Sequence, residues 1–167
     1  MTPVLKPIAD SFHTTNLVLA LCLGDLKGDD ATKRTRDGDG PSIAWQVGHM
    51  LEFRCMALQL LGGAKERSKA VEDTAAGSPD GGTHPDLTTY QREWEQINAA
   101  LDAALQAAAP ELLERIVDDK VHGEKTVLES LVFLTWHEAY HVGGLTAIRK
   151  QFGYPGPAEL NVARVAS

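Results

Sequence analysis

Apolar residues recur at intervals of three and four along four segments of the chain, which is typical of helices with one buried face. The predicted helices run from about Pro7 to Leu26, from the N-cap Ser42 to Leu61, from about Asp86 to Pro110, and from Thr126 to a last turn at Arg149 and Lys150. No segment shows the alternation of apolar and polar residues that is typical of strands. The pattern predicts an all-α fold, a four-helix bundle.

The connection between the second and third predicted helices is unusually long. Residues 64–85 contain several glycines and prolines and no sustained apolar pattern. We expect this segment to be a crossover that lets two consecutive helices run parallel. The fourth helix has the clearest start, because Thr126 and Glu129 fit the T-x-x-E capping box.

The length, net charge and apolar content of the chain disfavour several classes of protein. The 167 residues suffice for one domain, which we expect to span 1–167, and the net charge of −7 would repel nucleic acids and anionic membrane surfaces. No window approaches the ~18 continuous apolar residues of a membrane span, so we expect a cytoplasmic protein without a membrane partner. Cys22 and Cys55 form no spaced pair and are expected to be buried free thiols.

Two histidines lie on the buried side of the fourth predicted helix. His141 falls on the apolar seam between Leu134 and Leu145, and His137 precedes it by one turn, about 40° round the helix. His49 lies near the apolar face of the second helix and is the best candidate for a third ligand. A single buried histidine is usually satisfied by hydrogen bonds, but three would need partners that one shared metal supplies. The pattern predicts one divalent ion, since neutral imidazoles suit zinc, nickel, iron or copper.

The other histidines, His13, His84 and His122, lie in weaker settings for a metal. The stretch 137–141 also fits H-E-x-x-H, the helix signature of zinc metalloproteases. Ala147 stands where the longer form of that motif has a third histidine, and no strand pattern is present to bind a peptide. The protease interpretation is therefore disfavoured.

The order and spacing of these motifs resemble those of the DinB/YfiT-like family. Residues 42–50, SIAWQVGHM, are similar to its W-x-x-x-H region, and residues 126–145, TVLESLVFLTWHEAYHVGGL, are similar to its T-L-x-E-L-x-x-H-x-x-x-H-x-G segment. The resemblance implies a four-helix bundle with a long crossover after the second helix. It also implies a metal held by His49, His137 and His141.

The activities implied by the resemblance are broad. Relatives include S-transferases that use bacillithiol, mycothiol or glutathione, a mycothiol-dependent isomerase, metal-dependent hydrolases, and members without a known reaction. A metal with three protein ligands can ionise a thiol or activate a water molecule. We expect a thiol S-transferase acting on a small electrophile, with zinc or nickel and a low-molecular-weight thiol as cofactors. A hydrolase that uses a metal-bound water and a non-catalytic stress-response metal binder are the alternatives, and a homodimer fits all three.

Two further groups of residues are candidates for roles around the metal. Glu138, Tyr140 and Glu52 lie near the histidines along their helices and are candidates for handling protons, although a solvated surface position is expected for Glu52. An anionic thiol would need basic side chains at the mouth of the site. The candidates for that role are Arg54, Lys65, Arg67 and Arg149.

Overall fold

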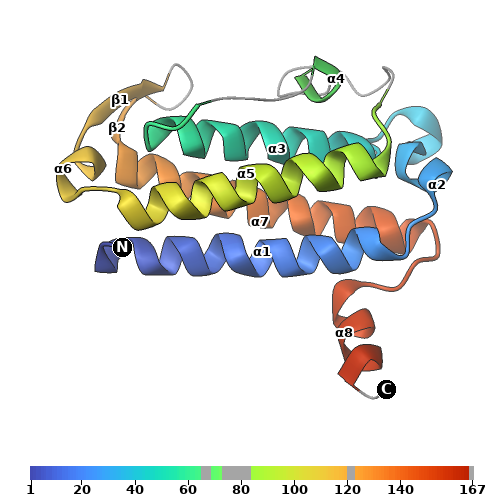
Figure 1. The fold of residues 1–167 in the computed structure, drawn as a ribbon. Helices are drawn as coiled ribbons and strands as arrows, with labels where there is room; N and C mark the ends of the chain where they lie inside the picture. The colour runs from blue at the N-terminus through green and yellow to red at the C-terminus, as the bar shows by residue number, and fades with distance from the viewer. Residues whose placement is uncertain (65–68, 73–83, 120–122, 166–167) are drawn as a thin grey trace.

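The fold is a bundle of four long helices (Figure 1). The computed structural model describes all residues except 65–68, 73–83, 120–122 and 166–167. The long helices are α1 (Lys6–Gly24), α3 (Ile43–Leu60), α5 (Leu87–Ala107) and α7 (Val127–Gln151). The shorter elements are η1 (Pro3–Leu5), α2 (Gly28–Thr32), η2 (Arg36–Gly38), α4 (Lys69–Glu72), α6 (Pro110–Leu113), β1 (Ile116–Asp119), β2 (Gly123–Thr126) and α8 (Pro157–Val165). The predicted helical class is confirmed.

The four long helices run in two directions. In Figure 1, α1 and α7 run one way along the bundle, and α3 and α5 run the other way. Because α3 and α5 are consecutive long helices with the same direction, the chain must return along the bundle between them, as the sequence predicts. Within that return the structure describes the short helix α4.

Polar side chains cap three of the four long helices at the predicted residues. The hydroxyl of Ser42 accepts a hydrogen bond from the Trp45 amide at 3.1 Å, and Asp86 caps α5 in the same way. At the start of α7 the capping box is complete. The Thr126 hydroxyl accepts from the Glu129 amide at 3.1 Å, and the Glu129 carboxylate accepts from the Thr126 amide at 2.7 Å.

Besides short helices, the structure adds a pair of strands that the periodicity does not predict. β1 and β2 form an antiparallel hairpin in which Ile116 pairs with Thr126 and Asp119 pairs with Gly123. Each strand has four residues, too few for an alternating pattern to stand out from the surrounding loop. The hairpin ends at the N-cap of α7, so it determines where that helix enters the bundle.

The core lies between the four long helices. Its apolar side chains come from all of them, and α3 and α7 also bury charged residues among them. Cys22 and Cys55 are buried and unbonded to each other, as expected. Within the described part of the chain, no helix combines the length and the apolar character needed to cross a membrane.

Candidate metal centre

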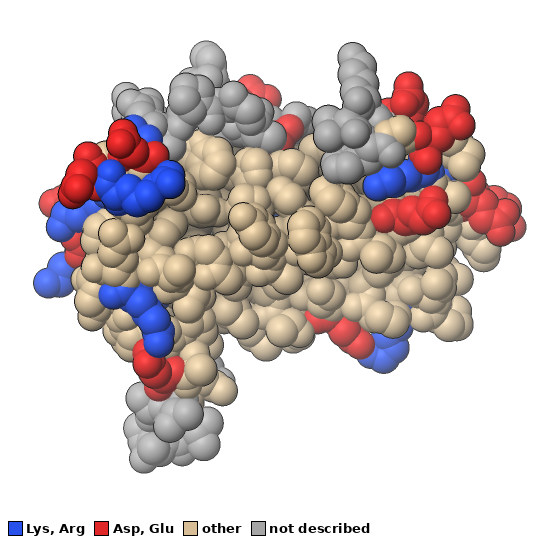
Figure 2. All heavy atoms as spheres, turned by 180° about the vertical axis from the view of Figure 1, so that it is seen from behind, with Lys and Arg blue, Asp and Glu red and all other residues tan. Residues whose placement is uncertain are grey.

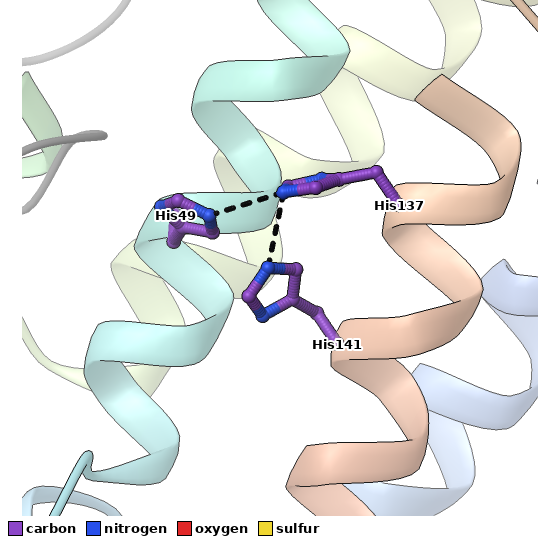
Figure 3. A group of neighbouring side chains, drawn as sticks. All are labelled: His49, His137 and His141. Atoms are coloured by element: carbon purple, nitrogen blue, oxygen red, sulfur yellow. Dashed lines mark hydrogen bonds between the residues drawn. The ribbon is translucent and has the colours of Figure 1, made fainter. Parts of the chain in front are cut away.

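Three histidines meet between α3 and α7 (Figure 3). The Nε2 atom of His137 lies 3.1 Å from Nε2 of His141 and 3.4 Å from Nε2 of His49. Helix geometry explains the convergence, because residues four apart on α7 lie on the same side, and that side faces α3. The structure thus brings together the three residues that the sequence predicts as ligands. We call this group the histidine triad.

The separations within the histidine triad suit a small divalent ion. Two nitrogen ligands held about 2.1 Å from a tetrahedral ion lie about 3.4 Å apart, close to the two measured separations. Among the described residues, no other group of three histidine, cysteine or acidic side chains brings its ligand atoms this close together. His137 is only partly buried, so the triad reaches the surface of the bundle.

Gln46 sets the protonation of one member of the triad. Its Oε1 atom lies 2.5 Å from Nδ1 of His141, and both side chains are buried. The amide oxygen can only accept, so the Nδ1–H of His141 donates to it and Nε2 carries the lone pair. Metal-binding histidines are typically oriented by such a second hydrogen bond.

The nitrogen contacts within the triad cannot all be hydrogen bonds. With a lone pair on Nε2 of His141, its contact with His137 needs a proton on Nε2 of His137. The contact between His137 and His49 then has no free lone pair on His137 to accept a proton. Only one of the two contacts is satisfied in any arrangement of a neutral triad, whereas one metal ion satisfies all three nitrogens.

Burial keeps two members of the triad neutral. Removal from water, together with a smaller effect of the neighbouring imidazoles, lowers the pKa of His141 to about 3 and that of His49 to about 4. A neutral imidazole is the form that binds metals. The lone pairs are therefore available at neutral pH.

Aromatic rings hold the imidazoles in place. The ring of Trp45 stacks on His49 with centroids 4.9 Å apart, and that of Phe53 lies 3.9 Å from His137. Tyr140 meets His141 edge-on at 5.1 Å while 65% of its surface stays exposed. Tyr140 thus lies beside the triad and faces solvent, a position compatible with the predicted role in handling protons.

The carboxylate of Glu138 is engaged with Arg54 in the core. It accepts hydrogen bonds from Nε and Nη2 of Arg54, at 2.7 and 2.6 Å, and from the hydroxyl of Thr15. Both members of the ion pair are buried, Glu138 with 2% and Arg54 with 0% of its surface exposed. The position of Glu138 therefore gives no support to its predicted role in handling protons.

Two of the four basic residues predicted at the mouth of the site are buried elsewhere. Arg54 is in the core, and Arg149 is buried against Asp25, to which it donates at 2.7 Å and 3.0 Å. The hydrogen bonds and ion pair of each guanidinium offset the free energy that its removal from water costs. Lys65 and Arg67 lie outside the described residues. Glu52 is buried rather than solvated.

Sequence reasoning misses Gln46. One signal could have revealed it: Gln46 lies three residues before His49, among apolar residues of a buried helix face. A polar side chain in such a position needs a hydrogen-bond partner, and a histidine of the facing helix is a natural one.

The comparison with known families agrees with the fold and with the triad. The model of the DinB superfamily matches residues 13–145, which is 133 of the 167 residues. The chain belongs to the DinB superfamily. The match includes all three histidines, and the resemblance inferred from the motifs is confirmed. A search of the curated proteins finds no match.

Gln46 gives a first test of the site in this DinB-superfamily protein. We expect Gln46→Leu to weaken metal binding by roughly 10- to 100-fold, because His141 loses the partner that fixes its tautomer. Gln46→Glu should keep the affinity, since a carboxylate also accepts from Nδ1–H. Competition with a chromogenic zinc chelator measures both, with Gln59→Leu, an exposed position on α3, as the control. Unchanged affinity in Gln46→Leu would refute the role of this hydrogen bond.

The lowered pKa values predict how stability depends on pH. In the unfolded chain His49 and His141 take up protons near pH 6.5, but in the folded protein only near pH 4 and pH 3. The unfolded state therefore binds more protons as pH falls below 6.5, and the metal-free protein should lose stability between pH 7 and 5. Urea unfolding in the presence of a chelator measures the effect.

A variant identifies the groups responsible for this pH dependence. His49→Gln combined with His141→Gln should flatten the fall between pH 7 and 5, whereas His13→Gln, at an exposed position on α1, should keep it. Carboxylates do not interfere in this window, because their unfolded pKa values lie near 4. A slope that is the same in all three proteins would contradict the assignment.

The buried ion pair gives a prediction for stability. Glu138→Leu leaves the Arg54 guanidinium buried without its counter-charge and should cost about 3–5 kcal/mol of unfolding free energy. Arg54→Met combined with Glu138→Leu should recover most of that loss, because no unpaired charge remains. Denaturant unfolding measures both, with the exposed Glu95→Leu as the control. A loss below about 1 kcal/mol in Glu138→Leu would speak against a buried pair.

Proposed function

We propose that this protein binds one divalent metal ion, zinc or nickel, through the histidine triad and transfers a low-molecular-weight thiol to a small electrophile. The observation that carries the proposal is the convergence of three imidazoles, with no carboxylate among the three ligands, at a point that reaches the surface. Three protein ligands leave coordination positions for another molecule. Membership of the DinB superfamily supports the same interpretation.

The surroundings of the triad favour a thiol over water as the nucleophile. A free thiol has a pKa near 8.5, whereas water has a pKa near 15.7, so water depends much more on a nearby general base. Of the two acidic residues expected as candidates for that base, Glu138 is engaged with Arg54, which leaves the buried Glu52, whose charge acts on His49. A bound ion would supply the positive charge that ionises a thiol near neutral pH.

We assign the other roles in the reaction to residues of the protein itself. The triad holds the ion, and Gln46 keeps His141 in the tautomer that presents Nε2. Tyr140, exposed beside His141, is placed to donate a hydrogen bond to the electrophile. In the transfer the thiol sulfur forms a bond to the electrophilic carbon, the leaving group departs with the bonding electrons, and the thiol proton passes to solvent.

Metal content is the first test of the proposal. Protein purified without a histidine tag should contain about one zinc or nickel ion per chain by mass spectrometry. His141→Ala should lose most of it, because two ligands remain, while His13→Ala should keep it. Absence of metal from the wild type, even after reconstitution, would defeat the proposal.

The thiol step needs a separate test. Cobalt-substituted protein should change its visible absorption when 2-mercaptoethanol or glutathione is added, because sulfur ligation produces a strong charge-transfer band. Conjugation of 1-chloro-2,4-dinitrobenzene with the thiol that binds should be metal-dependent and should fall in Tyr140→Phe. Cobalt protein that responds to neither thiol, and conjugates nothing, would favour the non-catalytic alternative.

A further inference from the structure

The side chains of α7 form three rows with different surroundings. Residues four apart share a row, and the row that contains His137 and His141 faces α3, whereas the row of Glu138 faces the core. The third row points outward. It consists of Val132, Trp136 and Tyr140, with 53%, 61% and 65% of their surfaces exposed. We call this row the aromatic stripe.

The aromatic stripe is continuous with the histidine triad. The rings of Trp136 and Tyr140 lie nearly parallel, with centroids 5.9 Å apart and an interplanar angle of 22°. Tyr140 then meets the ring of His141 edge-on, at 5.1 Å and 85°. A flat group lying on the stripe is therefore within one side-chain length of the triad.

The middle of the face formed by α3 and α7 is uncharged (Figure 2). Figure 2 shows the side of the bundle turned away from the viewer in Figure 1, where α3 and α7 lie. The middle of this face carries no charged side chains, and the charged ones gather toward its two ends. Lys125 lies at one end of the stripe: its ammonium is 5.4 Å from the ring of Phe133, and that ring is 5.8 Å from both Trp136 and His137. The burial of Arg54 and Arg149 in the core is consistent with this picture.

Resting on the proposed function, we infer that the aromatic stripe binds a flat, uncharged aromatic group of the electrophilic substrate. Exposed aromatic side chains next to a metal site are costly in water and mark a surface that is covered in use. Stacking on such rings contributes roughly 0.5–1.5 kcal/mol per pair beyond the burial of area. A second copy of the chain fits less well, because a stable dimer buries on the order of 800 Å² per partner, far more than one row of three side chains.

Two hydroxamates that differ only in their side group test the inference. Acetohydroxamate and benzohydroxamate bind a metal through the same oxygens, and the change in absorption of the cobalt-loaded protein reports each affinity. We expect benzohydroxamate to bind about tenfold tighter to the wild type. In Trp136→Ala and Tyr140→Ala the preference should shrink to about twofold or less. Leu17→Ala, at an apolar position of α1 with 56% of its surface exposed, should keep it.

Metal-free protein provides an independent arm. The stripe consists of protein side chains alone, so saturation-transfer NMR should detect weak binding of 2-naphthol to the metal-free wild type and little binding to Trp136→Ala. The 2-naphthol experiment tests the inference even if the chain binds no metal. A wild-type protein that binds no metal would contradict the proposed function, whereas a wild-type protein that gives no 2-naphthol signal would contradict only the inference.

Three results would overturn the inference. The first is equal affinity of the two hydroxamates for the wild type. The second is a preference for benzohydroxamate that survives in both stripe variants. The third is a wild-type dimer that becomes a monomer in Trp136→Ala by light scattering, without any aromatic preference. That result would assign the stripe to contact between two copies of the chain.

Discussion

The buried guanidinium of Arg54 is the interaction on which the rest of the bundle depends. From α3 it donates to Glu138 of α7, to the carbonyl oxygen of Phe12 and the hydroxyl of Thr15 in α1, and to the amide oxygen of Asn98 in α5. One side chain thus connects all four long helices. A charge without exposure to water is tolerable only with this number of partners, so the relative positions of the helices are constrained by its geometry.

The same constraint also positions the histidine triad, because His137 is the residue next to Glu138 in the chain. Glu138 must face the core to reach Arg54, and His137 precedes it by one residue, about 100° round the helix. Fixing the rotation of α7 about its axis therefore directs His137 and His141 toward α3 and leaves the aromatic stripe outside. The fold and the site share one determinant, because a rotation of α7 that separated the ion pair would also separate the triad.

Local patterns in the sequence predict a large part of this arrangement. Apolar spacing and capping residues locate the four long helices, and the interval of four between His137 and His141 predicts their convergence. The pairing of Arg54 with Glu138 has no local signal, since 84 residues separate them. The sequence suggests Glu138 as a group that handles protons and Arg54 as a cation for an anionic thiol, and only the packed helices show that both face the core. The hairpin of β1 and β2 is missed because its strands are short.

The charge of the triad is the property that most affects its chemistry. Its three ligands are neutral, and the nearby carboxylate of Glu138 is already compensated by Arg54. A divalent ion bound there would keep nearly its full charge, in surroundings that are aromatic rather than ionic and from which water is partly excluded. Electrostatic attraction is strongest in such a place, so an anionic sulfur or oxygen would be favoured as the next ligand over a neutral one. A carboxylate in the triad would weaken that preference, so a ligand set of three imidazoles favours an anion such as a thiolate as the next ligand.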